Sequence, residues 1–284
     1  MEVITKLFGQ YSFLQLWNFP LLLFLLSIAL IYRKWDAKKN KRVCFYWAIG
    51  CFFLLYGTPL AVISDQYLFT AKMLFEGITL FIISPLLLFS IPREQLQNIV
   101  WRIRKSKAAM FLTNPVTAFL LFYGIYWIYH YPAFSKLFYD SSLLESAAFY
   151  ILFVASLLVW RPVVTFLPGW HPLKEGNKLL YLLANAIALV FVTSPLLLSD
   201  KIFYSYDTLF SWSAVDDVQA GGAIVMVIHE IAVSIMIAWV ISQWGTKDGT
   251  TDPVNVGGLV DKYYWQKKRH KNLAASSYNW NKKK

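Results

Sequence analysis

Residues 67–92 read YLFTAKMLFEGITLFIISPLLLFSIP. This stretch is long and apolar enough to cross a bilayer, yet its first half carries Lys72 and Glu76. Residues four apart lie on one face of a helix, and charged groups at membrane depth usually face the bundle interior and pair there. We therefore expect a polar site inside a helical bundle, with the rest of the chain as its walls. The alternative is that Lys72 snorkels to the membrane surface and Glu76 merely neutralises it.

The composition indicates an all-α integral membrane protein. Of 284 residues, 57% are hydrophobic and only 15% are charged, and the chain holds 12 Trp and 17 Tyr. A soluble domain carries more charge, whereas Trp and Tyr gather at membrane interfaces. The formal charge of +11 does not indicate nucleic-acid binding, because the basic residues lie in loops and a tail beside apolar segments. The expected partner of the chain's surface is the lipid bilayer.

Apolar segments of spanning length recur along the chain, and we expect a bundle of seven transmembrane helices within residues 1–244. Residues 245–284 are polar and basic, which predicts a disordered tail held near anionic lipid or simply solvated. The predicted spans are 12–32, 43–63, 67–91, 109–131, 143–166, 178–199 and 219–243.

The positive charges predict the orientation of these spans. Of the 27 Lys and Arg, 22 lie in segments 33–42, 92–108 and 168–178 and in the tail, and only Lys6, Lys136 and Lys201 lie in loops on the other side. Cytoplasmic loops are enriched in Lys and Arg. We therefore expect a multi-pass protein of the cell membrane with its N-terminus outside and its C-terminus in the cytoplasm.

With this orientation, polar residues of four spans fall at similar depth near the outer face. Polar groups that converge at one depth predict a site; the alternative is that they are helix-end groups that meet water, which we expect for Asp216 and Lys136. The candidate polar cluster consists of Lys72, Glu76, His130, Glu145, Asp217 and Gln219, together with Glu230 farther along the seventh span.

Prolines and glycines in the spans predict local features of packing. Prolines kink a membrane helix, and neighbours satisfy the carbonyls they free. Gly221 and Gly222 predict close approach of another helix to the start of the seventh span. The prolines concerned are Pro85, Pro115, Pro162 and Pro195.

Four other residues receive structural interpretations. Arg161 lies near the cytoplasmic end of its span, where we expect it to snorkel. Glu230 in the middle of the seventh span is expected to be buried and to need a partner. We expect that His229 is not this partner, because adjacent residues do not share a helix face. Cys44 and Cys51 are seven residues apart on one predicted helix, which is the wrong geometry for a disulfide. We interpret them as ordinary buried thiols; the alternative is that the pair binds copper or haem.

No catalytic motif is present in the sequence. It contains no GxxxxGK[ST] phosphate loop, no HExxH and no GxSxG. Two of the four histidines, His171 and His270, lie in a loop and in the tail. The sequence therefore predicts a protein that is not an enzyme.

Several short motifs, in this order, resemble the CtaG family of bacterial assembly factors of cytochrome c oxidase. The resemblance covers about residues 65–245 and implies a seven-helix membrane protein that helps to make an active copper–haem oxidase. It also implies copper handling, and oxidase subunits or other assembly factors as partners. The motifs are AKMLFE with PLLLFSIP, YHYPAF, VWRPVVTFLP, YSYD and DDVQAGGAIVMVIHE.

At three positions this sequence departs from the family pattern. Lys72 stands where the third span of the family has a histidine, and Glu76 and Glu145 stand at two further polar or histidine positions. An ammonium group offers no lone pair to a metal, and lysine with carboxylates suits an ion-pair network better than copper. Met73 and His130 are the metal ligands that remain, so no resident cofactor is expected and copper binding would be weak.

The first interpretation is thus a CtaG-like membrane protein that assists maturation of a respiratory oxidase. A second is a carrier of copper or a small solute through an outward-facing polar cavity, and a third is an unrecognised membrane enzyme. An open path through the bundle would favour the carrier, whereas a closed core with paired charges would favour a scaffold.

The charge asymmetry generates the first testable prediction. A reporter of membrane topology fused after Lys284 should report a cytoplasmic position, and one inserted in the 200–215 loop should report an external position. The reason is that 22 of the basic residues lie on the side of the membrane predicted to be cytoplasmic. An external position of the reporter fused after Lys284 would contradict the predicted topology.

Overall fold

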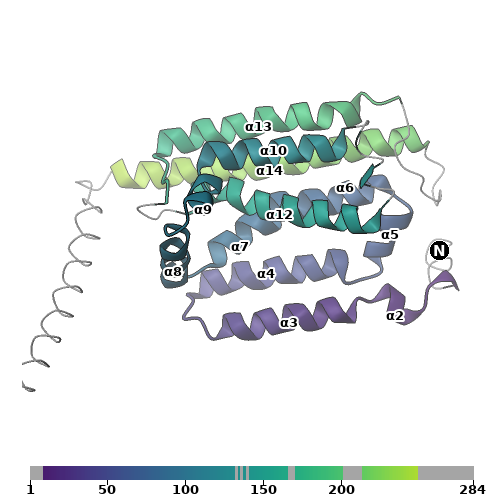
Figure 1. Ribbon diagram of the computed structural model, residues 1–284, viewed down its shortest axis with the longest axis horizontal. Helices are drawn as coiled ribbons and strands as arrows, with labels where there is room; N and C mark the ends of the chain where they lie inside the picture. The colour runs from purple at the N-terminus through teal and green to yellow at the C-terminus, as the bar shows by residue number, and fades with distance from the viewer. Residues whose placement is uncertain are drawn as a thin grey trace, which may run out of the picture.

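The computed structural model describes residues 9–131, 134, 137–138, 141–165, 170–200 and 213–248, without the side chains of 142 and 246–248. All regular structure in these ranges is helical, with no strand, and the long helices run side by side (Figure 1). The helices are α2 (Phe13–Leu16), α3 (Phe19–Arg33), α4 (Lys39–Tyr56), α5 (Leu60–Gln66), α6 (Phe69–Ile78), the π-helix η1 (Thr79–Ile83), α7 (Ser84–Ser90), α8 (Arg93–Ile103), α9 (Lys107–Leu112), α10 (Pro115–His130), α12 (Ser142–Val164), α13 (Glu175–Leu197) and α14 (Ala214–Asp248).

Four helices of the described ranges are long and apolar enough to cross a membrane: Phe69–Ser90, Leu143–Val164, Glu175–Leu197 and Ala214–Gly245. The pair α4 and α5, bent by 55°, becomes a fifth if it is counted as one span. The other two predicted spans contain α3 and α10, which have 15 and 16 residues. The described structure is thus all-helical, as expected, and four of its helices have the length and apolar composition of membrane spans.

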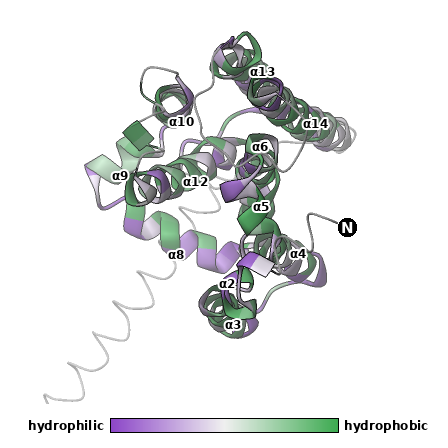
Figure 2. Cartoon of the chain, turned by 90° about the vertical axis from the view of Figure 1, so that its right-hand side faces the viewer, coloured by the Kyte–Doolittle hydropathy of each residue, from purple (hydrophilic) through white to green (hydrophobic). Residues whose placement is uncertain are grey.

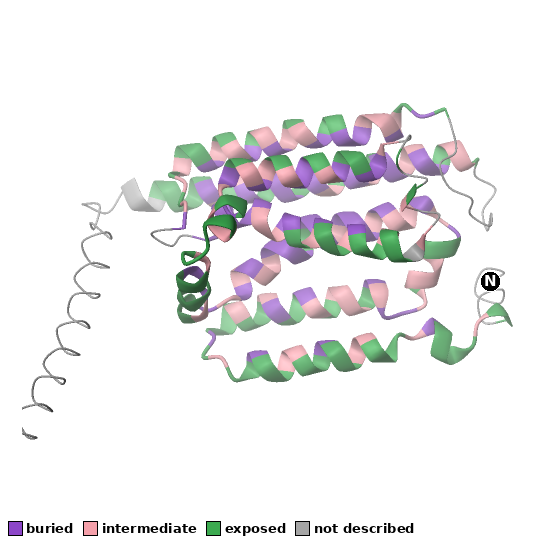
Figure 3. Ribbon diagram, viewed as in Figure 1, coloured by how far each residue is buried: buried purple, intermediate pink, exposed green. Residues whose placement is uncertain are grey.

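The third predicted span lies at the centre of the bundle. Two thirds (67%) of its apolar window is buried, compared with 33% for each of the other three candidate spans. The view along the helices shows α6 between α5, α12 and α14 (Figure 2), and buried positions are frequent along α6 and α7 (Figure 3). Within the described residues, this stretch is therefore the most buried of the candidate spans.

Pro85 explains how this central span is joined to α12. In the π-helix before it, each carbonyl accepts from the amide five residues later, so the Leu80 carbonyl would need the amide hydrogen that Pro85 lacks. Two α12 side chains donate to Leu80 O instead: Trp160 Nε1 at 2.9 Å and Ser156 Oγ at 3.1 Å. A neighbouring helix therefore satisfies the freed carbonyl, as predicted.

Pro115 has a different role from the predicted one. It is the first residue of α10, and Asn114 caps the helix by accepting a hydrogen bond from Val116 N at 3.0 Å. Proline is favoured at this position because the amide it lacks would be unpaired there anyway. The predicted fourth span thus starts at 115 rather than 109. The bend in the second span comes at Gly57, between α4 and α5.

The prediction that Arg161 snorkels is wrong. Its side chain is buried, with 1% exposed, and it donates from Nη1 to the Trp170 carbonyl and from Nη2 to the Thr113 carbonyl, each at 2.5 Å. Its guanidinium also lies over the Trp170 ring. A planar guanidinium with several donors can bind two carbonyls at once. Arg161 thereby ties the end of α12 to the start of α10 and to the chain that leads into α13.

Gly221 and Gly222 allow α14 to approach two helices at once. A Cβ on Gly221 would lie 2.8 Å from Phe69 Cδ1 and 3.0 Å from Met73 Cγ, both on α6. A Cβ on Gly222 would lie 2.9 Å from Leu196 Cβ on α13. The predicted close contact is confirmed, and small residues at such positions are typical of membrane helix packing.

This contact generates the second prediction. Gly221→Ala should destabilise the protein by about 1–3 kcal/mol, the usual cost of overpacking, measured by thermal unfolding in detergent. The matched control is Gly50→Ala on α4, where a Cβ would meet nothing within 4 Å and alanine should stabilise the helix slightly. Equal behaviour of the two variants would contradict the proposed packing role of Gly221.

Candidate functional site

Lys72 of α6 forms an ion pair with Glu145 of α12. Both side chains are mostly buried, with 13% and 28% exposed. The predicted pairing of Lys72 with a glutamate is therefore confirmed for Glu145, and the ammonium does not point away from both glutamates. Glu145 is placed in the first turn of α12, whose start is capped by Ser141.

Glu76, one turn after Lys72, faces His130 at the end of α10. Glu76 Oε1 lies 3.5 Å from His130 Nε2, and the two side chains are 3% and 0% exposed. His130 Nδ1 lies 3.2 Å from the Tyr126 carbonyl, which can only accept, so Nδ1 carries a hydrogen. A neutral His130 then presents a lone pair at Nε2 toward the Glu76 carboxyl.

Tyr126 completes the buried part of this site. Its hydroxyl is directed at the Glu76 carboxyl. Among the described residues, the Tyr126 hydroxyl, Glu76 Oε1 and His130 Nε2 have no hydrogen bond of normal geometry. Three polar atoms that face one another at this depth form a compact site, in which small movements would complete their hydrogen bonds. Asp65 of α5 adds a negative charge that acts on Lys72.

The side chains of Asp217 and Gln219 form hydrogen bonds with backbone groups at the ends of other helices. Asp217 accepts from the amides of Phe69 and Thr70, at 2.8 and 2.9 Å, so a side chain of α14 caps the start of α6. A carboxylate at a helix N-terminus is favoured by the helix dipole. Gln219 Nε2 donates to the Ser199 carbonyl at 2.9 Å. Both residues therefore fix the ends of helices.

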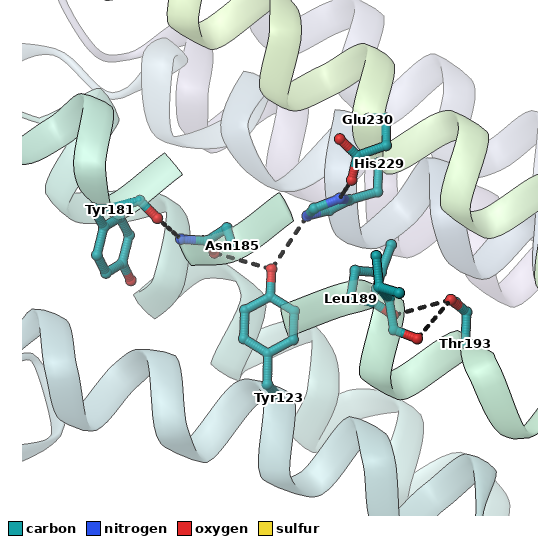
Figure 4. Close-up of polar contacts among 8 residues, drawn as sticks. Tyr123, Tyr181, Asn185, Leu189, Thr193, His229 and Glu230 are labelled. Carbon is teal, nitrogen blue, oxygen red and sulfur yellow. Dashed lines mark hydrogen bonds and ion pairs between the residues drawn. The ribbon is translucent and has the colours of Figure 1, made fainter. Parts of the chain in front are cut away.

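Glu230 lies outside the cluster. It is thirteen residues after Asp217 on α14, about 20 Å along the helix. Its side chain is 39% exposed, and Glu230 Oε1 lies 3.1 Å from His229 Nδ1. Two expectations are thereby corrected: Glu230 is only partly buried, and the adjacent His229 is its partner, because both side chains bend toward each other across one helical step (Figure 4).

His229 belongs to a second polar network that the sequence interpretation missed. Its Nε2 lies 3.1 Å from the Tyr123 hydroxyl, which donates to Asn185 Oδ1 at 3.0 Å. Asn185 Nδ2 in turn donates to the Tyr181 carbonyl at 2.5 Å (Figure 4). A polar asparagine in an apolar span was the available signal, since buried amides need partners.

The cluster offers few ligands for a metal. The described residues contain no group of three or more His, Cys, Asp or Glu side chains that could hold an ion. Glu76 Oε1 and His130 Nε2 could serve as two ligands, and Met73 is buried one turn before Glu76. Cys44 and Cys51 are free thiols on α4. One imidazole and one carboxylate beside an ammonium do not make the soft donor set that Cu(I) prefers.

The ion pair generates the third prediction. Lys72→Met should leave the Glu145 carboxylate without its partner and lower the free energy of unfolding by at most about 3–5 kcal/mol, the range for a fully buried pair. Lys72→Met combined with Glu145→Leu should recover most of that loss. The measurement is thermal unfolding in detergent.

Lys107→Met on the exposed surface of α9 provides the control, with an expected effect within about 0.5 kcal/mol. If Lys72→Met were as mild as Lys107→Met, the ion pair would contribute nothing to the stability of the bundle.

One comparison with known proteins identifies the family. The model of the cytochrome c oxidase caa3 assembly factor family (Caa3_CtaG) matches residues 22–247, from within α3 to the end of α14. No curated protein and no solved structure matches the chain. The match covers well over half of the 284 residues and includes both polar networks. This chain is a member of the cytochrome c oxidase caa3 assembly factor family, Caa3_CtaG.

Proposed function

We propose that this protein assists the maturation of a respiratory cytochrome c oxidase from within the bacterial cell membrane. Seven segments cross the membrane, including the shorter α3 and α10, with the N-terminus outside and the C-terminus in the cytoplasm. The observation that carries the proposal is the family match over residues 22–247, since the family is one of oxidase assembly factors. Oxidase subunits or other assembly factors are the partners.

The protein acts as a scaffold without catalytic chemistry. The charged residues of the polar cluster meet partners within the chain: Lys72 pairs with Glu145, and Glu76 faces His130. Removal of one partner of a buried pair leaves the other charge uncompensated, so the Lys72–Glu145 contact ties α6 to α12. The sequence carries none of the catalytic motifs sought above, and the polar cluster offers no serine or cysteine that a neighbouring base could activate.

A transport path has less support. The structure has a cavity of about 370 Å³ between α3, α4 and α7, lined by apolar and aromatic side chains such as Ile28, Tyr32 and Phe45. None of the residues of the polar cluster lines it. The carrier of copper or a small solute, which requires an outward-facing polar cavity, therefore remains the second candidate.

Copper is not held at the position of Lys72 in this protein. The ammonium lacks a lone pair and is engaged with Glu145. Met73 and His130 could contribute to weak binding, and Met73 packs against Gly221. The protein thus supports assembly through its helices, and any copper passes without being stored at this site.

The fourth prediction tests this function in two measurements. Deletion of the gene should lower cytochrome c oxidase activity in membranes, and the gene supplied in trans should restore it. Elemental analysis of the purified protein should find clearly less than one copper per chain.

Normal oxidase activity in the deletion strain would reject the assembly role and leave the carrier as the better candidate. Stoichiometric copper that is lost on His130→Ala or Met73→Leu would instead show that the remaining ligands suffice for a copper site. The two results are independent, so either half of the proposal can fail alone.

A further inference from the structure

Glu230 places a carboxyl group at the middle of a membrane-spanning helix. The candidate span runs from Ala214 to Gly245, so Glu230 is about 24 Å from one end and about 22 Å from the other at 1.5 Å per residue. Even so, 39% of its side chain is exposed. A carboxyl group that faces outward at this depth is costly in lipid and usually marks a functional contact.

The surface around Glu230 faces away from the bundle. The same side of α14 exposes Val227, Ile231 and Ile235, each more than half exposed, and α14 lies at the outside of the bundle beside α13 (Figure 2). Ser234 and Ala238 follow Glu230 at intervals of four and are also exposed. Small residues one turn apart let a second helix approach closely. We call this surface, Glu230 with Val227, Ile231, Ser234, Ile235 and Ala238, the Glu230 face.

The buried network fixes what Glu230 can offer to a partner. Asn185 Nδ2 donates to the Tyr181 carbonyl, so Asn185 Oδ1 must accept the single hydrogen of the Tyr123 hydroxyl. His229 Nε2 must then donate to the Tyr123 oxygen. One proton remains between His229 Nδ1 and Glu230 Oε1, on either atom. In both arrangements Glu230 Oε2 carries lone pairs only, and it has no hydrogen-bond partner among the described residues.

We propose that the Glu230 face docks a transmembrane helix of the oxidase under assembly, and that this helix presents a hydrogen-bond donor to Glu230 Oε2 at mid-membrane depth. The proposal rests on the proposed function for the identity of the partner. The donor is required because Oε2 can only accept, and the small residues beside it provide the room. A second copy of this chain fits less well, since a symmetric contact through Glu230 would bring two acceptors together.

Photo-cross-linking in membranes tests the docking. A photoreactive amino acid is placed at Val227 or Ser234 in cells that produce the oxidase, and adducts are probed with antibodies against each oxidase subunit. Adducts with an oxidase subunit are expected from both positions. The control positions are Tyr150 on α12 and Leu180 on α13, which are 63% and 66% exposed, lie on other helices and should give none.

Two substitutions test the donor. Glu230→Leu in the Ser234 cross-linking background should lower the oxidase adduct at least tenfold, because the acceptor is removed. Glu230→Gln keeps an acceptor oxygen and can donate to His229 Nδ1 through its amide, so it should retain the adduct. The amount of protein in the membrane and its melting temperature in detergent show whether either variant fails to fold.

The outcomes separate this inference from the proposed function. Adducts of twice the chain mass at Val227 and Ser234 would overturn it in favour of a homodimer. Loss of oxidase activity on gene deletion, with no oxidase adduct at these positions or with equal adducts for Glu230→Leu and the unchanged protein, would overturn the docking and leave the assembly role intact. Normal oxidase activity on deletion would reject the assembly role itself.

Discussion

The fold depends on one carbonyl oxygen that its own helix cannot satisfy. In the bilayer an unpaired backbone group costs several kcal/mol, and Pro85 removes the amide that Leu80 O would use in the π-helix. Trp160 and Ser156 supply the missing donors from α12. These hydrogen bonds fix how far the central span and α12 are shifted along each other. In this alignment Lys72 lies opposite Glu145. The sequence motifs that contain Pro85 and Trp160 thus form the same contact, between the central span and α12.

Much of this architecture could be predicted from composition and spacing, but the side-chain partners only in part. Apolar length and charge identified the central span, and the glycine pair at 221 and 222 correctly predicted close helix contact. Arg161 was misjudged because burial of a guanidinium requires carbonyls from two distant segments, which spacing along one helix cannot reveal. The error at Glu230 came from treating adjacent residues as pointing apart, although side-chain rotation lets them meet.

In the part of the chain that the structure describes, two histidines each face a glutamate, His130 facing Glu76 and His229 facing Glu230. At His130 and at His229 one ring nitrogen is committed to a fixed partner, a carbonyl in the first case and the Tyr123 hydroxyl in the second. The other nitrogen faces a glutamate. Each of these two carboxyl groups thus has a polar neighbour, whereas an ionised carboxylate alone in apolar surroundings would be costly. The family membership supports a role in assembly, in which these contacts contribute to a stable interior.

The π-helix Thr79–Ile83 also explains how one span can be the core for two sets of neighbours. Its extra residue rotates every following side chain by about 100° relative to an uninterrupted α-helix. Before it, α6 packs on α14 and directs its charged residues to α10 and α12; after it, α7 packs on α4 and α12. A regular helix would keep one apolar stripe throughout and could not turn to α4 in its second half. The loss of a single residue between 79 and 83 would therefore shift the phase of the span and separate α3 and α4 from the rest of the bundle.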